Sequence, residues 1–194
     1  MVRTRTFDPS TALSQAVAVF SSKGYSETSM EDIVKATGVS RYGLYGTFGN
    51  KRELFEAALE RYADRMGRQS FLRLLEPDAS LEHIRAIFRD RVEDLCDQGA
   101  SKGCLFIHTA QELAPQDHEI KGVLEKFMRR IAKAFAVGLE SAKAQGEIRA
   151  DVDVQAAGNM LTSTMFGLAV LGRTGFDKET LDGIVDSTLS TLTP

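Results

Sequence analysis

Cysteine, proline and long apolar runs are scarce in this sequence of 194 residues, and each shortage excludes a class of protein. The two cysteines, Cys96 and Cys104, are too few for a disulfide scaffold or a zinc site. No apolar run approaches the ~18 residues that a membrane span needs, and the start MVRTRTFDPS lacks the apolar core of a signal peptide. We therefore expect a cytoplasmic protein that does not associate with a membrane.

Charge is distributed unevenly along the chain, although its sum is small. The net charge is -3, yet residues 1–55 hold seven Lys/Arg against five acidic residues. The acidic excess thus lies in the remainder of the chain. This distribution argues against a nonspecific, strongly basic nucleic-acid binder, but it allows a DNA-binding segment at the N-terminal end.

Start and stop signals predict an all-α chain of about nine helices. Asp8-Pro9, Ser29 with Asp32, and Asn50 with Glu53 are typical helix N-termini. Val, Ile and Thr do not gather into alternating runs, so we expect no strand. The expected helices cover about residues 9–23, 30–37, 41–47, 51–67, 80–96, 103–113, 117–145, 153–173 and 177–192.

The stretch VSRYGLYGTFGNKRELF, residues 39–55, is an unusual place for a helix. Two short helices around the turn Gly38-Val39-Ser40 have the layout of a helix-turn-helix, whose second helix enters the major groove of DNA. That second helix is too short to be stable alone, and Gly43 and Gly46 weaken it further. The glycines would, however, let its backbone come close to a duplex. Arg41, Tyr42, Tyr45 and Thr47 occupy the side opposite to its apolar residues.

Residues 3–62 carry motifs that resemble the N-terminal DNA-binding domain of the TetR/AcrR family of bacterial repressors. The motifs are F-x3-G-Y at 20–25, T-S-M-x2-I at 28–33, A-x-G-V-S at 36–40 and L-Y-x2-F-x2-K-x2-L-F at 44–55. The resemblance implies a DNA-binding domain over residues 1–50, a connecting helix over 51–67, and a ligand-binding and dimerisation domain over 68–194. It also implies a homodimer, a palindromic double-stranded operator, a small-molecule effector and no cofactor.

The resemblance assigns DNA contacts to Thr28, Ser29, Ser40, Arg41, Tyr42, Tyr45, Thr47 and Lys51. Thr28, Tyr45 and Lys51 would contact phosphates, whereas Arg41 and Tyr42 would face bases. Gly46 and Thr47 depart from the family pattern, which often has an aromatic residue at position 47. The helix N-termini at Ser29 and Asn50 offer N–H groups to phosphate, and Arg3 and Arg5 form either a minor-groove arm or a solvated tail.

The C-terminal half carries two weaker assignments. Two apolar stripes are either ordinary core or, as the family's dimerisation through a helix pair implies, a dimer interface: Ala157, Leu161, Thr164, Met165 and Leu168, then Leu181, Ile184, Val185 and Leu189. Gly158, Ser163 and Gly167 are small enough for close helix approach. The candidate ligand-pocket residues, which plain packing explains as well, are Cys104, Phe106, His108, Phe127, Met128, Met160 and Phe166.

Two other function classes compete with a repressor. His108 and Glu112 are spaced four apart, as two metal ligands of an enzyme would be, but nothing supplies further ligands, and no phosphate loop or catalytic triad is present. We therefore predict no metal and no catalysis. A protein that only binds other proteins would fail to shift DNA.

Cys104 follows Lys102-Gly103 at the expected start of a helix, a setting that favours the reactive thiolate. It is either an electrophile sensor or a small buried apolar residue. A disulfide with Cys96 is conceivable.

Overall fold

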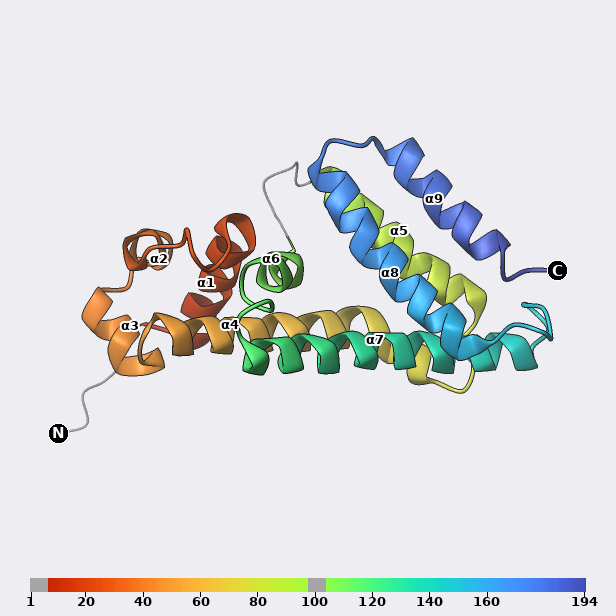
Figure 1. Ribbon diagram of the computed structural model, residues 1–194, viewed down its shortest axis with the longest axis horizontal. Coiled ribbons are helices and arrows are strands. Elements are labelled where there is room, and N and C mark those ends of the chain that lie inside the picture. Colours follow the sequence, from red (N-terminus) through yellow and green to blue (C-terminus); the bar gives the residue numbers. More distant parts are fainter. Residues whose placement is uncertain (1–6, 98–103) are drawn as a thin grey trace. The chain divides into compact units, whose positions relative to one another are not determined.

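Nine α-helices and no strand make up the described residues, 7–97 and 104–194, of the computed structural model (Figure 1). The all-α prediction is confirmed, and most helix boundaries agree within two residues. The helices are α1 (Pro9–Lys23), α2 (Met30–Thr37), α3 (Arg41–Phe48), α4 (Lys51–Met66), α5 (Leu81–Asp97), α6 (Leu105–Glu112), α7 (His118–Ala144), α8 (Val154–Arg173) and α9 (Lys178–Ser190). Arg3, Arg5 and Lys102 lie outside the described residues.

The chain divides into two compact units, neither of them continuous in sequence. Described residues 7–65 and 104–121 form the N-terminal unit, and residues 66–97 and 122–194 form the C-terminal unit. Helix α6 and the first turn of α7 therefore belong to the same unit as the helix-turn-helix, although they follow it by more than fifty residues. The sequence offered no signal for this, because it shows segments but not their long-range packing.

Local capping and an aromatic core hold the N-terminal unit together. Asp8 accepts hydrogen bonds from the backbone N–H groups of Ser10 and Thr11, which begins α1 as its sequence predicts. The Phe20 and Phe55 rings meet edge to face, with 5.1 Å between their centroids. Arg52 joins α4 to α7 through Asp117, with 2.5 Å between Nη1 and Oδ2.

In the C-terminal unit, α5, α8 and α9 lie side by side (Figure 1). Phe135 of α7 packs against Phe71 and Phe88, with centroid separations of 5.3 and 5.7 Å. Gly158 allows α8 to approach α7, because a Cβ there would lie only 2.5 Å from the Ala132 carbonyl oxygen. This glycine is therefore used for packing inside the protomer.

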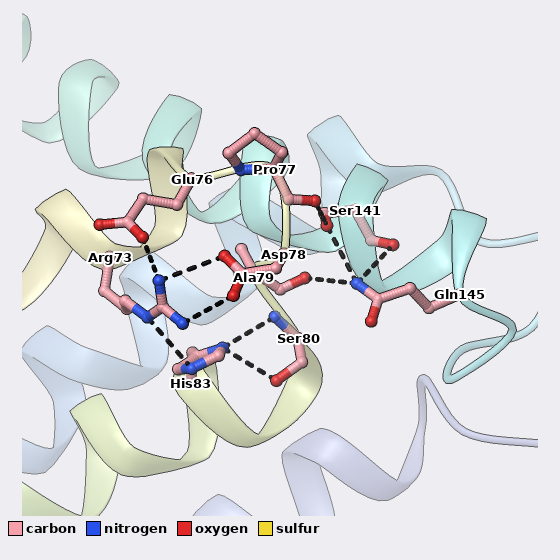
Figure 2. Close-up of polar contacts among 9 residues, drawn as sticks. All are labelled: Arg73, Glu76, Pro77, Asp78, Ala79, Ser80, His83, Ser141 and Gln145. Carbon is pink, nitrogen blue, oxygen red and sulfur yellow. Dashed lines mark hydrogen bonds and ion pairs between the residues drawn. The ribbon is translucent and has the colours of Figure 1, made fainter.

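A π-helical turn (Gly67–Phe71) and a 3-10 turn (Leu72–Leu75) connect α4 to α5, and neither was predicted from the sequence. A polar network secures the following loop (Figure 2). Arg73 binds Glu76 and Asp78, and its Nε lies 3.2 Å from His83 Nε2, while the backbone nitrogen of Ser80 lies 3.0 Å from His83 Nδ1. From α7, Ser141 donates to the Pro77 carbonyl at 2.9 Å and Gln145 to that of Ala79 at 2.8 Å.

Helix α8 is long and apolar enough to cross a membrane, contrary to the expectation that no segment is. Length and composition are the only grounds, and the core helices of soluble proteins meet the same criteria. Its buried residues, such as Leu161 and Leu168, pack within the C-terminal unit. The polar and small residues Gln155, Asn159 and Ser163 are exposed on the same helix. We therefore assign α8 to the helical bundle.

Candidate nucleic-acid interface

Helix α3 presents a narrow polar and aromatic surface to solvent. Ser40 caps it by accepting a hydrogen bond from the Gly43 N–H at 3.1 Å, and Leu44 anchors it in the core with 1% exposure. On its outer side Tyr42 is 73% exposed and Tyr45 is 41% exposed. Two large aromatic side chains exposed on one short helix make this surface a candidate binding patch. The burial pattern agrees with the faces expected from the sequence.

The two glycines of α3 have different surroundings. A Cβ at Gly46 would meet nothing within 4 Å, so this side of the helix is open. A Cβ at Gly43 would lie 3.0 Å from Val39 Cγ1 and 3.4 Å from Phe7 Cε1. Gly43 therefore serves packing within the unit, and only Gly46 fits the expectation of a smooth, approachable surface.

Arg41 lies at the exposed start of α3 but has a partner. Its Nη2 lies 3.0 Å from Oε1 of Glu31 in α2, and its Cζ lies 5.9 Å from the centre of the Tyr45 ring. An exposed ion pair contributes little stability, so the pair holds the guanidinium beside Tyr45 without fixing it strongly. The sequence did not predict this role of Glu31.

Local side chains cap the N-termini of α2 and α4. Asp32 accepts from the Ser29 backbone N–H at 2.9 Å, and Ser29 Oγ accepts from the Asp32 N–H at 3.1 Å. Asn50 and Glu53 make the equivalent contacts at the start of α4. Lys23, 2.6 Å from the Asp32 carboxylate, and the bonds from Ser29 hold the pKa of Asp32 well below its usual value. We expected these helix N-termini to offer N–H groups to phosphate. The Ser29 and Asn50 N–H groups, however, already donate to the side chains of Asp32 and Glu53.

Thr28 and Lys51 adjoin the turn between α1 and α2. Thr28 is 1% exposed and donates its hydroxyl proton to the Gly24 carbonyl at 2.5 Å, so its side chain is engaged inside the turn. This corrects the expectation that its hydroxyl reaches a phosphate. Lys51 Nζ lies 4.4 Å from the centre of the Tyr25 ring, which places its charge at this turn. Thr47, at the far end of α3, is half-buried.

The candidate pocket residues are divided between the two units. Cys104, Phe106 and His108 belong to the N-terminal unit, whereas Phe127, Met128, Met160 and Phe166 belong to the C-terminal unit. Cys104 and Phe106 are buried, and both contact Tyr62: its hydroxyl lies 3.6 Å from Cys104 Sγ, and its ring centroid lies 5.2 Å from that of Phe106. Both cysteines are free thiols, Cys96 exposed and Cys104 buried.

Most residues of the two predicted dimer stripes are core residues of the protomer. Ala157, Leu161, Met165, Leu168, Leu181, Val185 and Leu189 are all buried. Side chains already buried within one chain add no area to an interface, so these seven explain the packing of α8 and α9 rather than a dimer. Thr164 and Ile184 alone of the nine are partly exposed.

Sequence reasoning missed Glu112 as part of the N-terminal unit, because we considered it only as a metal partner of His108. Its Oε1 lies 3.9 Å from His108 Nδ1, but its other oxygen binds the backbone of Tyr25 and Ser26. No cluster of three or more His, Cys, Asp or Glu side chains suited to a metal occurs within residues 7–97 and 104–194. A contact across 87 positions leaves no local sequence signal.

Two family descriptions match the chain. Residues 12–58 match bacterial regulatory proteins of the tetR family, and residues 80–187 match the tetracyclin repressor-like C-terminal domain.

Similar proteins agree with both descriptions. The uncharacterized HTH-type transcriptional regulator YezE of Bacillus subtilis (strain 168) is 34% identical over 193 residues, which are 99% of this chain and 100% of YezE. The HTH-type transcriptional repressor ComR of Escherichia coli (strain K12) is 30% identical over 188 residues, 96% of this chain and 90% of ComR. Among solved structures, a cysteine mutant of the TetR family transcriptional regulator CifR, in complex with 26-bp double-strand operator DNA, has a TM-score of 0.84. It is 27% identical and covers 98% of this chain and 99% of its own.

Proposed function

The chain belongs to the TetR family of bacterial transcriptional regulators, and we propose that it is a repressor that binds a palindromic operator as a homodimer and leaves it when an effector binds. The exposed face of α3, with Tyr42 and Tyr45 on a helix whose Gly46 side is open, is the observation that carries the DNA-binding part. ComR, a repressor of similar length, and CifR, solved on operator DNA, support it. In this proposal the chain is a cytoplasmic protein without catalytic activity.

The DNA contacts divide by role. Arg41 and Tyr42, at the N-terminal end of α3, face base edges, since recognition helices read bases with their N-terminal residues. Tyr45, Lys51 and Ser40 contact phosphates through their side chains, and such contacts position the protein without reading sequence. Ser29, whose hydroxyl donates to Asp32 at 2.7 Å, supports the start of α2. Thr47 contributes from the end of α3, and Thr28 supports the turn from inside. Residues 1–50 are the proposed DNA-binding domain.

The proposed dimer uses the outer face of α8 instead of its buried stripe. Asn159, Ser163, Gly167 and Val170 are exposed and recur every three or four residues, which places them on one side of the helix. A Cβ at Gly167 would meet nothing within 4 Å, so a second helix can approach closely there. A twofold axis through this face would pair it with the same face of a second copy. Thr164, next to Ser163 in α8 and partly exposed, borders the face.

The proposed effector acts through differential binding. A ligand that prefers a conformation in which the two α3 helices no longer fit successive major grooves lowers operator affinity. Phe127, Met128, Met160 and Phe166 are the candidate contacts for a noncovalent effector in the C-terminal unit. Cys104, beside Tyr62 and Phe106 in the N-terminal unit, is the candidate contact for an electrophile.

Selection of bound duplexes from random DNA tests the proposal. We expect the purified protein to enrich a palindrome whose half-sites lie about one helical turn apart, on the order of 34–36 Å. Enrichment of no sequence, in low as well as moderate salt, would contradict operator binding. The genes next to matching genomic sites would then indicate the chemical class of the effector.

A further inference from the structure

Glu112, the last residue of α6, lies on the turn that joins α1 to α2. Its Oε2 accepts hydrogen bonds from the backbone N–H groups of Tyr25 at 2.9 Å and Ser26 at 3.0 Å. The turn begins at Gly24, whose φ is +82°, and a Cβ there would lie 1.9 Å from Glu112 Oε1. Glycine is thus needed at this position both for its backbone conformation and for space. The carboxylate sits directly on the bare backbone of the turn.

The same turn carries two groups of the candidate interface. The Tyr25 ring lies under the Lys51 ammonium, 4.4 Å from Nζ, and packs edge on against Phe55 with 4.8 Å between centroids. The Gly24 carbonyl accepts the Thr28 hydroxyl proton just before Ser29 caps α2. A shift of this turn would therefore move the Lys51 charge and the start of α2 together.

We propose that Glu112 is a positioning residue for DNA binding: its carboxylate fixes the Gly24–Ser26 turn and, through Tyr25, sets the place of the Lys51 ammonium. Glu112 does not touch the DNA, since a carboxylate next to phosphate would repel it. The inference rests on the proposed function, because Lys51 is a phosphate contact only in a DNA-binding protein. Charge-assisted hydrogen bonds to two consecutive N–H groups are strong enough to hold a short turn.

Helix α6 connects this contact to Cys104, the candidate contact for an electrophile. Cys104, His108 and Glu112 are spaced four residues apart and thus lie along one face of α6. His108 Nδ1 lies 3.9 Å from Glu112 Oε1. A displacement of α6 along its axis would pull the Glu112 carboxylate off the turn, and Lys51 would lose its fixed support.

The competing explanation is that Glu112 only stabilises the N-terminal unit. The two explanations differ in the salt dependence of DNA binding. Loss of stability reduces the fraction of active protein, which lowers the apparent affinity by the same factor at every salt concentration. Loss of a phosphate contact instead reduces the slope of log K against log salt by about 0.9 for each contact, and thus by about 1.8 for the two protomers of a dimer.

The test uses full-length variants and the duplex that the wild type selects from random DNA. The affinity of each variant for this duplex is measured at several salt concentrations between about 50 and 200 mM. We expect Glu112→Ala to weaken binding roughly fivefold to tenfold and to flatten the slope by about 1.8, since each of the two protomers loses one phosphate contact. Glu112→Gln, whose amide oxygen can accept the same two N–H groups, should stay within about threefold of the wild type. Gln111→Ala, at the exposed neighbouring position of α6, is the matched control.

The double variant with Lys51→Ala completes the test. Because Glu112 acts through Lys51, the double variant should bind no more than about twofold weaker than Lys51→Ala alone. An unchanged slope in Glu112→Ala, or a full additive loss in the double variant, would overturn the inference while leaving the repressor proposal in place. If Glu112→Ala does not fold, Glu112→Asp replaces it, because this variant keeps the charge on a shorter side chain. A salt slope equal to that of the wild type in Glu112→Asp would also overturn the inference. A wild type that selects no DNA would overturn the proposed function and this inference with it.

Discussion

Single residues of α2, α3 and α4 provide the most direct test of how this chain reads DNA. Lys51 has its charge at the α1–α2 turn, whereas Arg41 lies at the N-terminal end of α3 beside Tyr45. We expect Lys51→Ala and Tyr45→Ala to weaken binding to selected and random duplexes alike, since phosphate contacts carry no sequence information. Arg41→Ala should also relax base preference at one position, by about 1–3 kcal/mol. Competition titrations with single-base operator variants measure this difference.

Glu31 supplies the matching control for Arg41. Because the Glu31 carboxylate pairs with the Arg41 guanidinium at 3.0 Å, Glu31→Gln frees the guanidinium and removes a negative charge near the proposed backbone contacts. Affinity should therefore rise modestly, with base preference intact. If Arg41→Ala lowers binding to all duplexes equally, Arg41 is another phosphate contact.

Cys104 permits a second prediction at this scale. The thiol is buried at the start of α6 with the Tyr62 hydroxyl 3.6 Å away, whereas Cys96 is exposed. If an electrophile acts as effector, a maleimide should release the wild type from its operator, and Cys104→Ser should abolish that release without weakening DNA binding. Cys96→Ser should leave the release unchanged. Mass spectrometry measures the modification of Cys104, and a DNA shift on the same samples measures release from the operator. If Cys104 stays unmodified in the native protein, or is modified without release, it is not an electrophile sensor.

Among elements, α3 shows what sequence patterns can and cannot reveal. Its boundaries, its cap at Ser40 and its buried Leu44 followed from spacing alone, because these are local properties. The different surroundings of Gly43 and Gly46 did not, since they depend on Phe7 and on open solvent. For the same reason the sequence revealed neither the Glu112 contact nor the membership of α6 in the N-terminal unit. Nor could it tell whether the apolar stripe of α8 is core or dimer interface.

Gly46→Ala should stabilise the folded protein and at the same time weaken its binding to the operator. Alanine at an open helical position gains roughly 0.5–1 kcal/mol over glycine, and a gain of that size raises the melting temperature by about 2–4 °C per kcal/mol in a chain of this length. The added methyl group, however, stands on the surface that we place in the groove, so operator affinity should fall. Differential scanning fluorimetry and DNA titration on one preparation measure both effects.

Gly43→Ala is the counterpart within the same helix. Its Cβ would crowd Val39 and Phe7, so this variant should gain no stability. Unchanged operator affinity in Gly46→Ala would mean that this side of α3 does not approach DNA.

The capping box of α2 makes the protein sensitive to acid. The folded state holds the pKa of Asp32 below its usual value, through Lys23 and the Ser29 bonds. A lowered pKa means that the stabilisation is fully present above the usual aspartate pKa of about 4 and is lost as the pH falls below it. Asp32→Asn should therefore lower the melting temperature at neutral pH, with a difference from the wild type that shrinks below about pH 4. If the melting temperatures of the variant and the wild type differ by the same amount from about pH 7 to about pH 3, this role of Asp32 is contradicted.

For the whole molecule, function depends on whether two copies pair through the outer face of α8. Val170 is 45% exposed at the end of the row that contains Ser163 and Gly167, and Val123 of α7, also 45% exposed, lies off this row. Val170→Glu places an unpaired charge in the proposed interface, where its desolvation is costly, so it should convert the dimer to a monomer. The same substitution at Val123 should leave the dimer intact.

Light scattering at matched concentrations measures the mass of each variant, and titration with the selected duplex measures the consequence. A monomer binds one half-site and loses the high effective concentration that a linked second site provides. Its affinity should therefore fall by about 10²-fold or more, with a shallower salt dependence because fewer phosphates are neutralised. A wild type that is monomeric in solution and yet binds the palindrome tightly would contradict the dimer. If Val170→Glu remains dimeric, two copies instead pair through a surface other than this face of α8.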